Sequence, residues 1–456
     1  MLRFGAFVVT QKLVLYRVLE ESGPKRSKPF TFNLDPLELP RASTDPKAIH
    51  GALQQAFSLA IKRSHDYETA FQPQPFVDLI FSDPEGTEET RDCRVGDAWH
   101  NLLDAVKNVS WISIKQNIVG LLYEIIVEER FRHQLGQFYT PEDVVGLLTT
   151  FAIRKPGELV LDPATGGGSF LRSAYTRKRA LGETHASALE TTWGCEITSF
   201  AAELSTVTLA TSDTQEPAAY PRVLLRDFFD LRPGLETDLE IPGVLGKLKV
   251  PVAFDAVIGN PPYISYRRLN NQDKIINALM TAGDGISLPK FTGKSDAYVW
   301  FIVHATQFIR NGGRLSFVVS SAILFSDYGI PLIRFIGYHY RIKAVIDSMV
   351  ERWFPDADTN TVLLLLEREE NRDARVQNDV RFVRLRRPLA QLIPDPSALN
   401  RRDQIEELLE IILNAGASED DPRMQVNVVR QGDNGGLTLG VDDPGKNPLD
   451  EDEEQE

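Results

Sequence analysis

Residues 135–370 alternate short apolar runs with stretches in which apolar residues recur at helical spacing. Short apolar runs between turn residues are typical of strands buried on both faces of a sheet, and helical stretches between them supply parallel crossovers. The pattern predicts an α/β fold with a mostly parallel, doubly wound, Rossmann-like sheet. The expected strands, in chain order, are Leu159–Leu161, Thr192–Cys195, Val223–Leu225, Phe254–Gly259, Gly313–Ser320, Ala344–Ile346 and Thr361–Leu366.

The segments on either side of this region have a different pattern. Residues 1–134 are predicted to form a mainly helical N-terminal domain, and the helical spacing is clearest in Ile114–Arg132. Residues 371–415 are predicted to form a short C-terminal extension, with a basic strand-like stretch (Val380–Arg387) and an amphipathic helix (Arg401–Asn414). Residues 416–456 are rich in glycine, proline and acids, which predicts a disordered acidic tail.

The net charge of −14 argues at first against binding to DNA, because DNA binding requires cations that replace counterions. The tail weakens this objection, since residues 416–456 hold 12 acids and 3 bases, a net charge of −9, which leaves −5 for the other residues. The tail is expected to act as a solvating segment, with a DNA-mimicking or partner-binding role as the alternative.

Composition places the chain among large intracellular enzymes. An apolar content of 42% is ample for sizeable cores, and the length predicts two or three domains. Cys93 and Cys195 are too few and too isolated for a disulfide framework or a metal site, so a cytoplasmic location is expected. No stretch reaches the length of a membrane span, and the first residues lack a signal-peptide cleavage site.

The run Phe254–Gly259 ends in Asn260-Pro261-Pro262-Tyr263. Two consecutive prolines lack N–H groups and have a fixed φ, so the strand must stop there and a rigid turn must follow. The Asn260 side-chain oxygen and the Pro261 carbonyl oxygen could accept hydrogen bonds from an exocyclic amine on an aromatic ring, and Tyr263 could stack on that ring. The alternative is an ordinary proline-rich loop.

A glycine-rich turn follows the first predicted strand, in Asp162-Pro163-Ala164-Thr165-Gly166-Gly167-Gly168-Ser169-Phe170. Glycines let the backbone approach a ligand closely, and the start of the following helix offers free N–H groups. The turn matches neither a Walker loop nor the spaced dinucleotide fingerprint. A tight turn with only a structural role is the alternative.

Acidic residues follow the next two predicted strands. Glu196 ends the second strand, where an acid can hold two ribose hydroxyls, and Asp227 follows the third, where it could accept a hydrogen bond from an adenine amine. Each acid alone could be a solvated loop residue. Together, the acids predict a nucleoside-binding site at this edge of the sheet. The Asn-Pro-Pro-Tyr turn follows the fourth strand, which ends at the same edge.

The glycine-rich turn followed by Asn260-Pro261-Pro262-Tyr263 resembles the S-adenosylmethionine and catalytic motifs of DNA adenine-N6 methyltransferases. Gly136-Gln137-Phe138-Tyr139-Thr140-Pro141 resembles the motif that precedes the cofactor loop in the gamma group of these enzymes, which includes methylase subunits of restriction-modification and phage-defence systems. The resemblance covers about residues 118–370. It implies a Rossmann-like S-adenosylmethionine-dependent methyltransferase sheet. The chain departs from the usual motif at Thr165, where cysteine is frequent, and at the extra glycine Gly167.

The resemblance implies S-adenosyl-L-methionine as the cofactor. Thr140 would bind the methionine carboxylate, Glu196 would hold the ribose, and Asp227 would hold the adenine of the cofactor. The loop that would cradle the methionine portion contains Asp162, Pro163, Ala164 and Gly166.

The resemblance also implies the roles around the target base. Asn260, Pro261, Pro262 and Tyr263 would hold a flipped adenine of double-stranded DNA, and Phe354 would pack against that base. Ordinary core packing is the alternative for Phe354. No metal is expected, because catalysis would rest on the positioning of the amine, which can lose its proton after methyl transfer.

Enzymes of the gamma group usually read their target with a domain placed after the catalytic domain, and residues 371–415 are too few for one. A separate specificity or defence-complex subunit is therefore expected as a partner. The polar segment 264–294 is a candidate DNA-closing loop, with a surface excursion as the alternative.

Three other functions remain open. The Asn-Pro-Pro-Tyr turn also occurs in enzymes that methylate a glutamine amide of release factors, and related turns occur in RNA guanine-N2 methyltransferases. A non-catalytic, cofactor-binding scaffold in a defence complex is the third. Gly136–Pro141 and the Asp-Pro start of the glycine-rich loop favour the DNA adenine group, and the complete Asn-Pro-Pro-Tyr turn argues against a scaffold.

Overall fold

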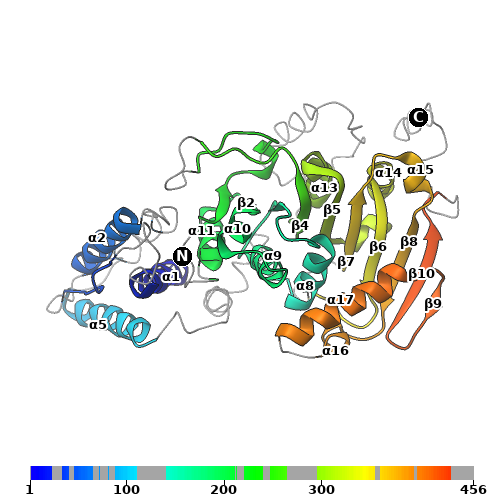
Figure 1. Cartoon of the computed structure of the whole chain (residues 1–456). Helices are drawn as coiled ribbons and strands as arrows, with labels where there is room; N and C mark the ends of the chain where they lie inside the picture. Colours follow the sequence, from blue (N-terminus) through cyan, green and yellow to red (C-terminus); the bar gives the residue numbers. More distant parts are fainter. Residues whose placement is uncertain are drawn as a thin grey trace.

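The computed structural model describes residues 2–22, 33–40, 46–64, 71, 81, 88–109, 140–210, 212, 220–239, 247–263, 295–354, 360–394 and 398–432. One large mixed sheet dominates this part of the chain, with helices on both faces (Figure 1). The predicted helix Ile114–Arg132, the Gly136–Tyr139 part of the first motif, and the polar segment 264–294 lie outside the described residues.

The sheet has ten strands in the order β3-β2-β1-β4-β5-β7-β6-β8-β10-β9. Neighbours from β3 to β5 are parallel, and β7 runs antiparallel to both β5 and β6, so the expected parallel arrangement holds in one half of the sheet. Each predicted strand is present. The strands are β1 (Val160–Asp162), β2 (Thr192–Glu196), β3 (Arg222–Leu225), β4 (Phe254–Gly259), β5 (Ile309–Ser320), β6 (Tyr340–Ser348), β7 (Thr361–Arg368), β8 (Asp379–Leu385), β9 (Glu419–Asp420) and β10 (Met424–Arg430).

Two hydrophobic cores lie on opposite faces of the sheet. The continuous apolar sequence of β7 supplies both of them, because alternate residues of a strand point to opposite faces: Leu364 joins one core and Leu365 the other. One face is covered by α13 (Ala297–Ala305), η5 (Thr306–Phe308), η6 (Ser321–Leu324) and α14 (Gly329–His339). The other core includes α8 (Glu142–Ala152), part of α9 (Ser169–Ala180), α16 (Leu389–Leu392) and α17 (Ala398–Asn414). The remaining short elements are α10 (His185–Glu190), η3 (Phe228–Asp230) and α15 (Arg372–Val376).

The C-terminal region is part of the main sheet. The predicted basic strand and amphipathic helix are present as β8 and α17, and α17 packs directly on α8, where a Cβ at Gly146 would meet Ile405 Cδ1 at 3.0 Å. Arg401 of α17 also forms an ion pair with Asp143 of α8. Residues 371–415 therefore complete the core rather than extend from it.

The prediction of disorder from residue 416 onward is wrong for residues 416–432. Strand β10 pairs with the whole length of β8, from Met424 opposite Leu385 to Arg430 opposite Asp379. Met424 and Val426 are buried against the core that contains α17, which gives this segment an apolar face that a count of acids does not reveal. Residues 433–456 lie outside the described residues.

The N-terminal region contains the helices α1 (Leu2–Ser22), α2 (Pro46–Ser64) and α5 (Glu88–Lys107) (Figure 1). Their shared core includes Leu204 and Ala210 of α11 (Ser199–Ala210), so the N-terminal helices pack against α11, the helix that lies on β2 and β3. Burial lowers the pKa of Lys12 in α1, and the nearby charge of Glu203 in α11 partly offsets this effect.

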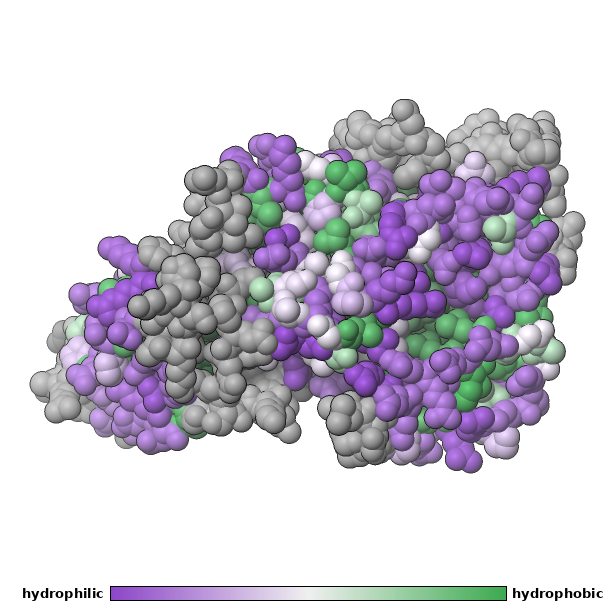
Figure 2. All heavy atoms as spheres, viewed as in Figure 1, coloured by the Kyte–Doolittle hydropathy of each residue, from purple (hydrophilic) through white to green (hydrophobic). Residues whose placement is uncertain are grey.

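In the described part of the chain, no helix is long and apolar enough to cross a membrane. Figure 2 shows that the face of the molecule seen in Figure 1 is predominantly hydrophilic, with hydrophobic residues gathered in small patches.

The packing of α17 generates a stability prediction. Ile412 is fully buried in the core between α17 and the sheet, so Ile412→Ala should lower the free energy of unfolding by about 2–5 kcal/mol through lost contacts and a residual cavity. Urea titration followed by tryptophan fluorescence measures this change, with the exposed Glu410→Ala on the same helix as the control. Equal stability of the two variants would contradict the assignment of α17 to the core.

Candidate functional site

The predicted site residues lie at the carboxyl ends of four adjacent strands. Asp162 ends β1, Glu196 ends β2, Asp227 follows β3 by two residues, and Asn260 follows β4 directly. The strand order reverses between β1 and β4, which are parallel neighbours. Ligands of open α/β sheets bind outside the carboxyl ends of the strands at such a switch point.

The glycine-rich loop between β1 and α9 is held against α11. Gly166 and Gly168 have φ of 50° and 85°, and a Cβ at Gly168 would lie only 3.0 Å from the Cα of Ser205. The Ser205 hydroxyl donates to the Gly166 carbonyl at 2.8 Å. Gly168 is the N-cap of α9 and supplies no side-chain cap, so the first amides of this helix are open to an acceptor.

Asp162 is fully buried at the end of β1. The backbone N–H of Ala164 donates to its Oδ1 at 3.1 Å, whereas Oδ2 has no hydrogen-bond partner within the described ranges. A Cβ at Gly259 would lie 2.9 Å from Oδ1, so the start of the Asn-Pro-Pro-Tyr turn passes directly beside this carboxylate. Burial and the charge of Glu196 raise the pKa of Asp162 to about 8. A buried carboxylate oxygen without a donor fits a ligand that brings a cationic or N–H group.

Glu196 and Asp227 are both fixed by backbone amides. Gly166 N–H donates to Glu196 Oε2 at 3.0 Å, which ties the glycine-rich loop to the end of β2. The backbone N–H and hydroxyl of Thr198 donate to the other oxygen of Glu196, at 2.9 and 2.8 Å. Asp227 Oδ1 accepts from Phe229 N–H at 3.0 Å. Each of the four carboxylate oxygens can accept further hydrogen bonds.

Sequence reasoning missed three residues beside these acids. Thr198 orients Glu196, and two apolar side chains, Ile197 and Leu225, are 65% and 51% exposed at the same sheet edge. An exposed apolar residue next to a strand-end acid offers a surface for an aromatic ring. The sequence did contain one indication of this apolar surface, because Ile197 directly follows Glu196, the acid that ends β2.

The Asn260 side chain is held at both ends. Its Nδ2 donates to the hydroxyl of Thr140 at 3.1 Å, and its Oδ1 accepts from the hydroxyl of Tyr263. Thr140 is buried immediately before Pro141, the N-cap of α8. The structure therefore joins the residue predicted for the cofactor carboxylate to the residue predicted for the target amine, although 120 positions separate them.

Aromatic rings surround Tyr263. Its ring meets Phe354 edge-on, with centroids 6.3 Å apart and an interplanar angle of 77°, and it meets Tyr298 of α13 in the same way at 6.4 Å. Phe354 is itself buried, so both packing against the base and ordinary core packing are compatible with its position. The hydroxyl of Tyr328 donates to Asp296 at 2.9 Å and lies behind Tyr298, which extends the aromatic cluster.

Comparison with known proteins places this site in a family. The family model described as N-6 DNA methylase matches residues 114–421, well over half of the chain. The chain belongs to the N-6 DNA methylase family. Membership confirms the recognition made from the three motifs, the predicted fold class, and S-adenosylmethionine as the methyl donor of the family.

Individual relatives are distant. The chain is 29% identical to the type II methyltransferase M.BstVI of Geobacillus stearothermophilus over 96 residues, which is 21% of this chain and only 16% of that protein. The solved methyltransferase subunit of a type I restriction-modification system from Streptococcus thermophilus has a TM-score of 0.56 at 18% identity, over 84% of this chain and 73% of that one. The modification subunit of a putative type I restriction enzyme from Vibrio vulnificus has a TM-score of 0.54 at 16% identity, over 94% and 87%. These structures support the fold of the N-6 DNA methylase family member described here.

The burial of Asp162 predicts a pH dependence of stability in the ligand-free protein. The unfolded carboxyl titrates near 3.8 and the folded one near 8, so the stabilisation is complete below about pH 4 and is lost as the pH rises toward 8. Asp162→Asn cannot ionise and should lack this decline. Its melting temperature relative to the wild type should therefore increase between pH 5 and pH 8 and level off above about pH 8.

Differential scanning fluorimetry across this pH range measures the effect. Asp403→Asn, at an exposed position of α17, serves as the control and should show no such increase. A constant difference between Asp162→Asn and the wild type would show that Asp162 stays ionised in the folded protein.

Proposed function

We propose that this chain transfers a methyl group from S-adenosylmethionine to the N6 amine of an adenine in double-stranded DNA. The observation that carries the proposal is the Asn260 amide, held between Thr140 and Tyr263 at the end of β4, one strand away from the buried carboxylate of Asp162. Membership of the N-6 DNA methylase family supports the same reaction.

The ends of β1, β2 and β3 fit the cofactor. The unpartnered Oδ2 of Asp162 suits the methionine ammonium, and the open amides at the start of α9 and the Thr140 hydroxyl suit its carboxylate. Glu196 would accept from the ribose hydroxyls and Asp227 from the adenine amine. When bound, S-adenosylmethionine supplies the electrophilic methyl group. The protein residues supply orientation and charge rather than acid–base chemistry.

The target adenine would occupy the space between the Asn-Pro-Pro-Tyr turn and the aromatic cluster. A base must leave the stack to reach this turn, at a cost of about a few kcal/mol that stacking on Tyr263 would help to offset. The Asn260 and Pro261 oxygens would accept the two hydrogens of N6, which localises the nitrogen lone pair for attack. Because Asn260 Oδ1 already accepts from Tyr263, the arriving amine would share or replace this bond. Phe354 would support Tyr263 from behind.

The biological setting follows as a further part of the proposal. We infer that the chain works in the cytoplasm as the modification subunit of a restriction-modification or phage-defence system, with a separate subunit that reads the DNA motif. Two solved relatives named for type I systems are subunits of this kind, and the fold similarity to them supports the inference.

The reaction is tested by incubating the purified protein with S-adenosylmethionine that carries a labelled methyl group and with duplex DNA, RNA or a release factor in parallel. We expect label in unmethylated DNA only, recovered as N6-methyladenine. Label in the protein substrate or in RNA guanine would overturn the proposal in favour of the related enzymes that share the turn.

Asn260→Ala should abolish methyl transfer and leave cofactor binding nearly intact, because Asn260 contacts the target base and the cofactor lies on other strand ends. Calorimetry with S-adenosylmethionine measures the second quantity. Substantial residual transfer by the purified variant would refute the role of Asn260.

Asp227→Ala tests the part of the site that would bind the adenine of the cofactor. Removal of a hydrogen-bond acceptor for the cofactor adenine should weaken cofactor binding by about 1–3 kcal/mol. Methyl transfer should recover at saturating cofactor, unlike that of Asn260→Ala. Unchanged affinity by calorimetry would place Asp227 outside the cofactor site.

A further inference from the structure

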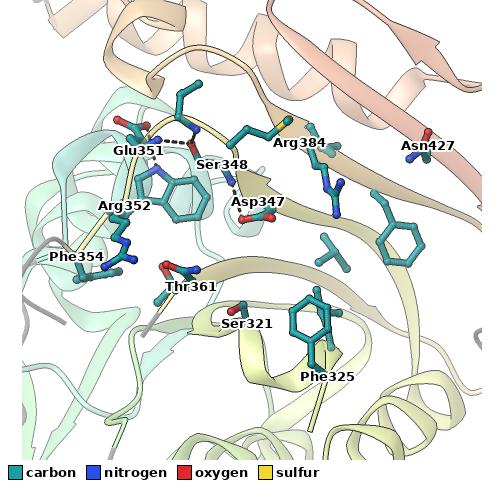
Figure 3. A pocket seen from close by; sticks show the side chains of 18 of the residues that line it. Ser321, Phe325, Asp347, Ser348, Glu351, Arg352, Phe354, Thr361, Arg384 and Asn427 are labelled. Carbon is teal, nitrogen blue, oxygen red and sulfur yellow. Dashed lines mark hydrogen bonds between the residues drawn. The ribbon is translucent and has the colours of Figure 1, made fainter. Parts of the chain in front are cut away.

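A cavity of about 770 Å³ adjoins the aromatic cluster (Figure 3). Its floor is the sheet face formed by β6, β8 and β10, and its walls are η6 with the following residue Phe325 and the loop 348–354 after β6. Phe354 belongs both to this wall and to the ring pair with Tyr263. The cavity therefore shares the Phe354 side chain with the proposed site of the target base.

The walls of the cavity expose apolar side chains. Phe325 is 81% exposed, and Met349 and Val350 on the opposite wall are 59% and 50% exposed. Exposed side chains of this kind serve as stacking platforms for unpaired bases or as wedges between base steps.

Two cations also line the cavity. The guanidinium groups of Arg352 and Arg384 have no ion pair or hydrogen bond with any described residue. Figure 3 shows Arg384 extending into the cavity from the β8 floor and Phe325 from the wall that follows η6. Hydroxyl and amide groups complete the lining, from Ser321, Thr361 and Asn427.

The two acids that line the cavity accept hydrogen bonds from N–H groups of the protein. Glu351 accepts from the indole N–H of Trp353 at 3.1 Å and from the backbone N–H of Leu389 at 2.7 Å. Asp347 accepts from the backbone N–H of Ser348 at 2.8 Å. These bonds orient one oxygen of each acid, whereas the two guanidiniums have no hydrogen-bond or ion-pair partner among the described residues. A ligand with anionic and flat aromatic parts fits this lining.

We propose that this cavity holds the nucleotides that flank the target adenine, with Phe325 stacked on a neighbouring base and Arg352 and Arg384 paired with phosphates. The inference rests on the proposed function, because it takes the ring pair of Tyr263 and Phe354 as the site of the target base. Nucleic acid is favoured over a protein partner because an exposed aromatic ring and two guanidiniums without a partner among the described residues line the same cavity, which complements a base and its backbone phosphates.

The test compares Phe325→Ala, Phe325→Trp and the double variant Arg352→Ala/Arg384→Ala with the wild type. Fluorescence anisotropy with a labelled mixed-sequence duplex, which contains an adenine opposite an abasic site, measures affinity at several salt concentrations. Arg387→Ala is the matched control, since Arg387 is also exposed at the end of β8 but does not line the cavity. The altered residues are exposed or have no side-chain partner, and melting temperatures verify folding.

Phe325→Ala should weaken duplex binding by roughly 5- to 150-fold, and Phe325→Trp should retain it, because tryptophan preserves the stacking surface. The double arginine variant should bind more weakly and should lower the slope of log affinity against log salt by about two. Arg387→Ala and cofactor binding should be unaffected. Wild-type affinity and salt slope in both cavity variants would overturn the inference and indicate a protein partner for the cavity.

A parallel measurement of methyl transfer to unmethylated DNA separates this inference from the proposed function. If the wild type methylates DNA while the cavity variants bind and methylate equally well, the inference fails and the proposed function stands. If the wild type transfers the methyl group to RNA or to the protein substrate and not to DNA, while DNA binding depends on Phe325 and the two arginines, the proposed reaction fails and the nucleic-acid site stands.

Discussion

The parallel pairing of β1 with β4 is the interaction on which the site depends. It sets the Asp162 carboxylate beside Gly259, so closely that a Cβ there would lie 2.9 Å from Oδ1. The next residue, Asn260, consequently begins its turn at the edge of the glycine-rich loop between β1 and α9. The pair of prolines stops the strand at this point, and the hydrogen bond from Asn260 to Thr140 ties the turn to the start of α8. A shift of one residue in this pairing would separate the two halves of the site.

The sequence was sufficient to predict the strands and the strand-end residues, because buried parallel strands are continuous apolar runs and glycine and proline mark their ends. It was insufficient for β9 and β10. In β10, Met424 and Val426 are buried and alternate with the polar residues Gln425 and Asn427, so the apolar face is short and the acids around it dominated the composition. The contact of Thr140 with Asn260 has no local signature, because the fold alone brings such distant residues together.

The electrostatics of Asp162 link the fold to ligand binding. Burial favours the neutral carboxyl, and the adjacent Glu196 adds to this effect, so an ionised Asp162 at the end of β1 is unfavourable in the ligand-free protein. A cationic ligand reverses the balance, because an opposite charge near a buried carboxylate favours ionisation. The same residue would therefore cost stability in the free protein and contribute affinity in a complex with a cationic ligand. A strained electrostatic environment of this kind is typical of binding sites rather than of core packing.

The effect of charge on DNA binding depends on where in this protein the charged groups lie. The net charge of −14 opposes DNA binding, yet much of it belongs to residues 416–456. Near the aromatic cluster, the carboxylates of Asp347 and Glu351 accept hydrogen bonds from backbone and indole N–H groups, and the guanidiniums of Arg352 and Arg384 have no partner among the residues that the structure describes. Two guanidiniums that form no ion pair with a described residue can still contact a phosphate backbone on an acidic protein, because exposed charges farther apart than about 8–10 Å are largely screened at physiological salt. An acidic surface elsewhere would disfavour indiscriminate binding along DNA. The arrangement would thus suit a protein that engages DNA mainly at the base it modifies and depends on a partner for the remaining affinity.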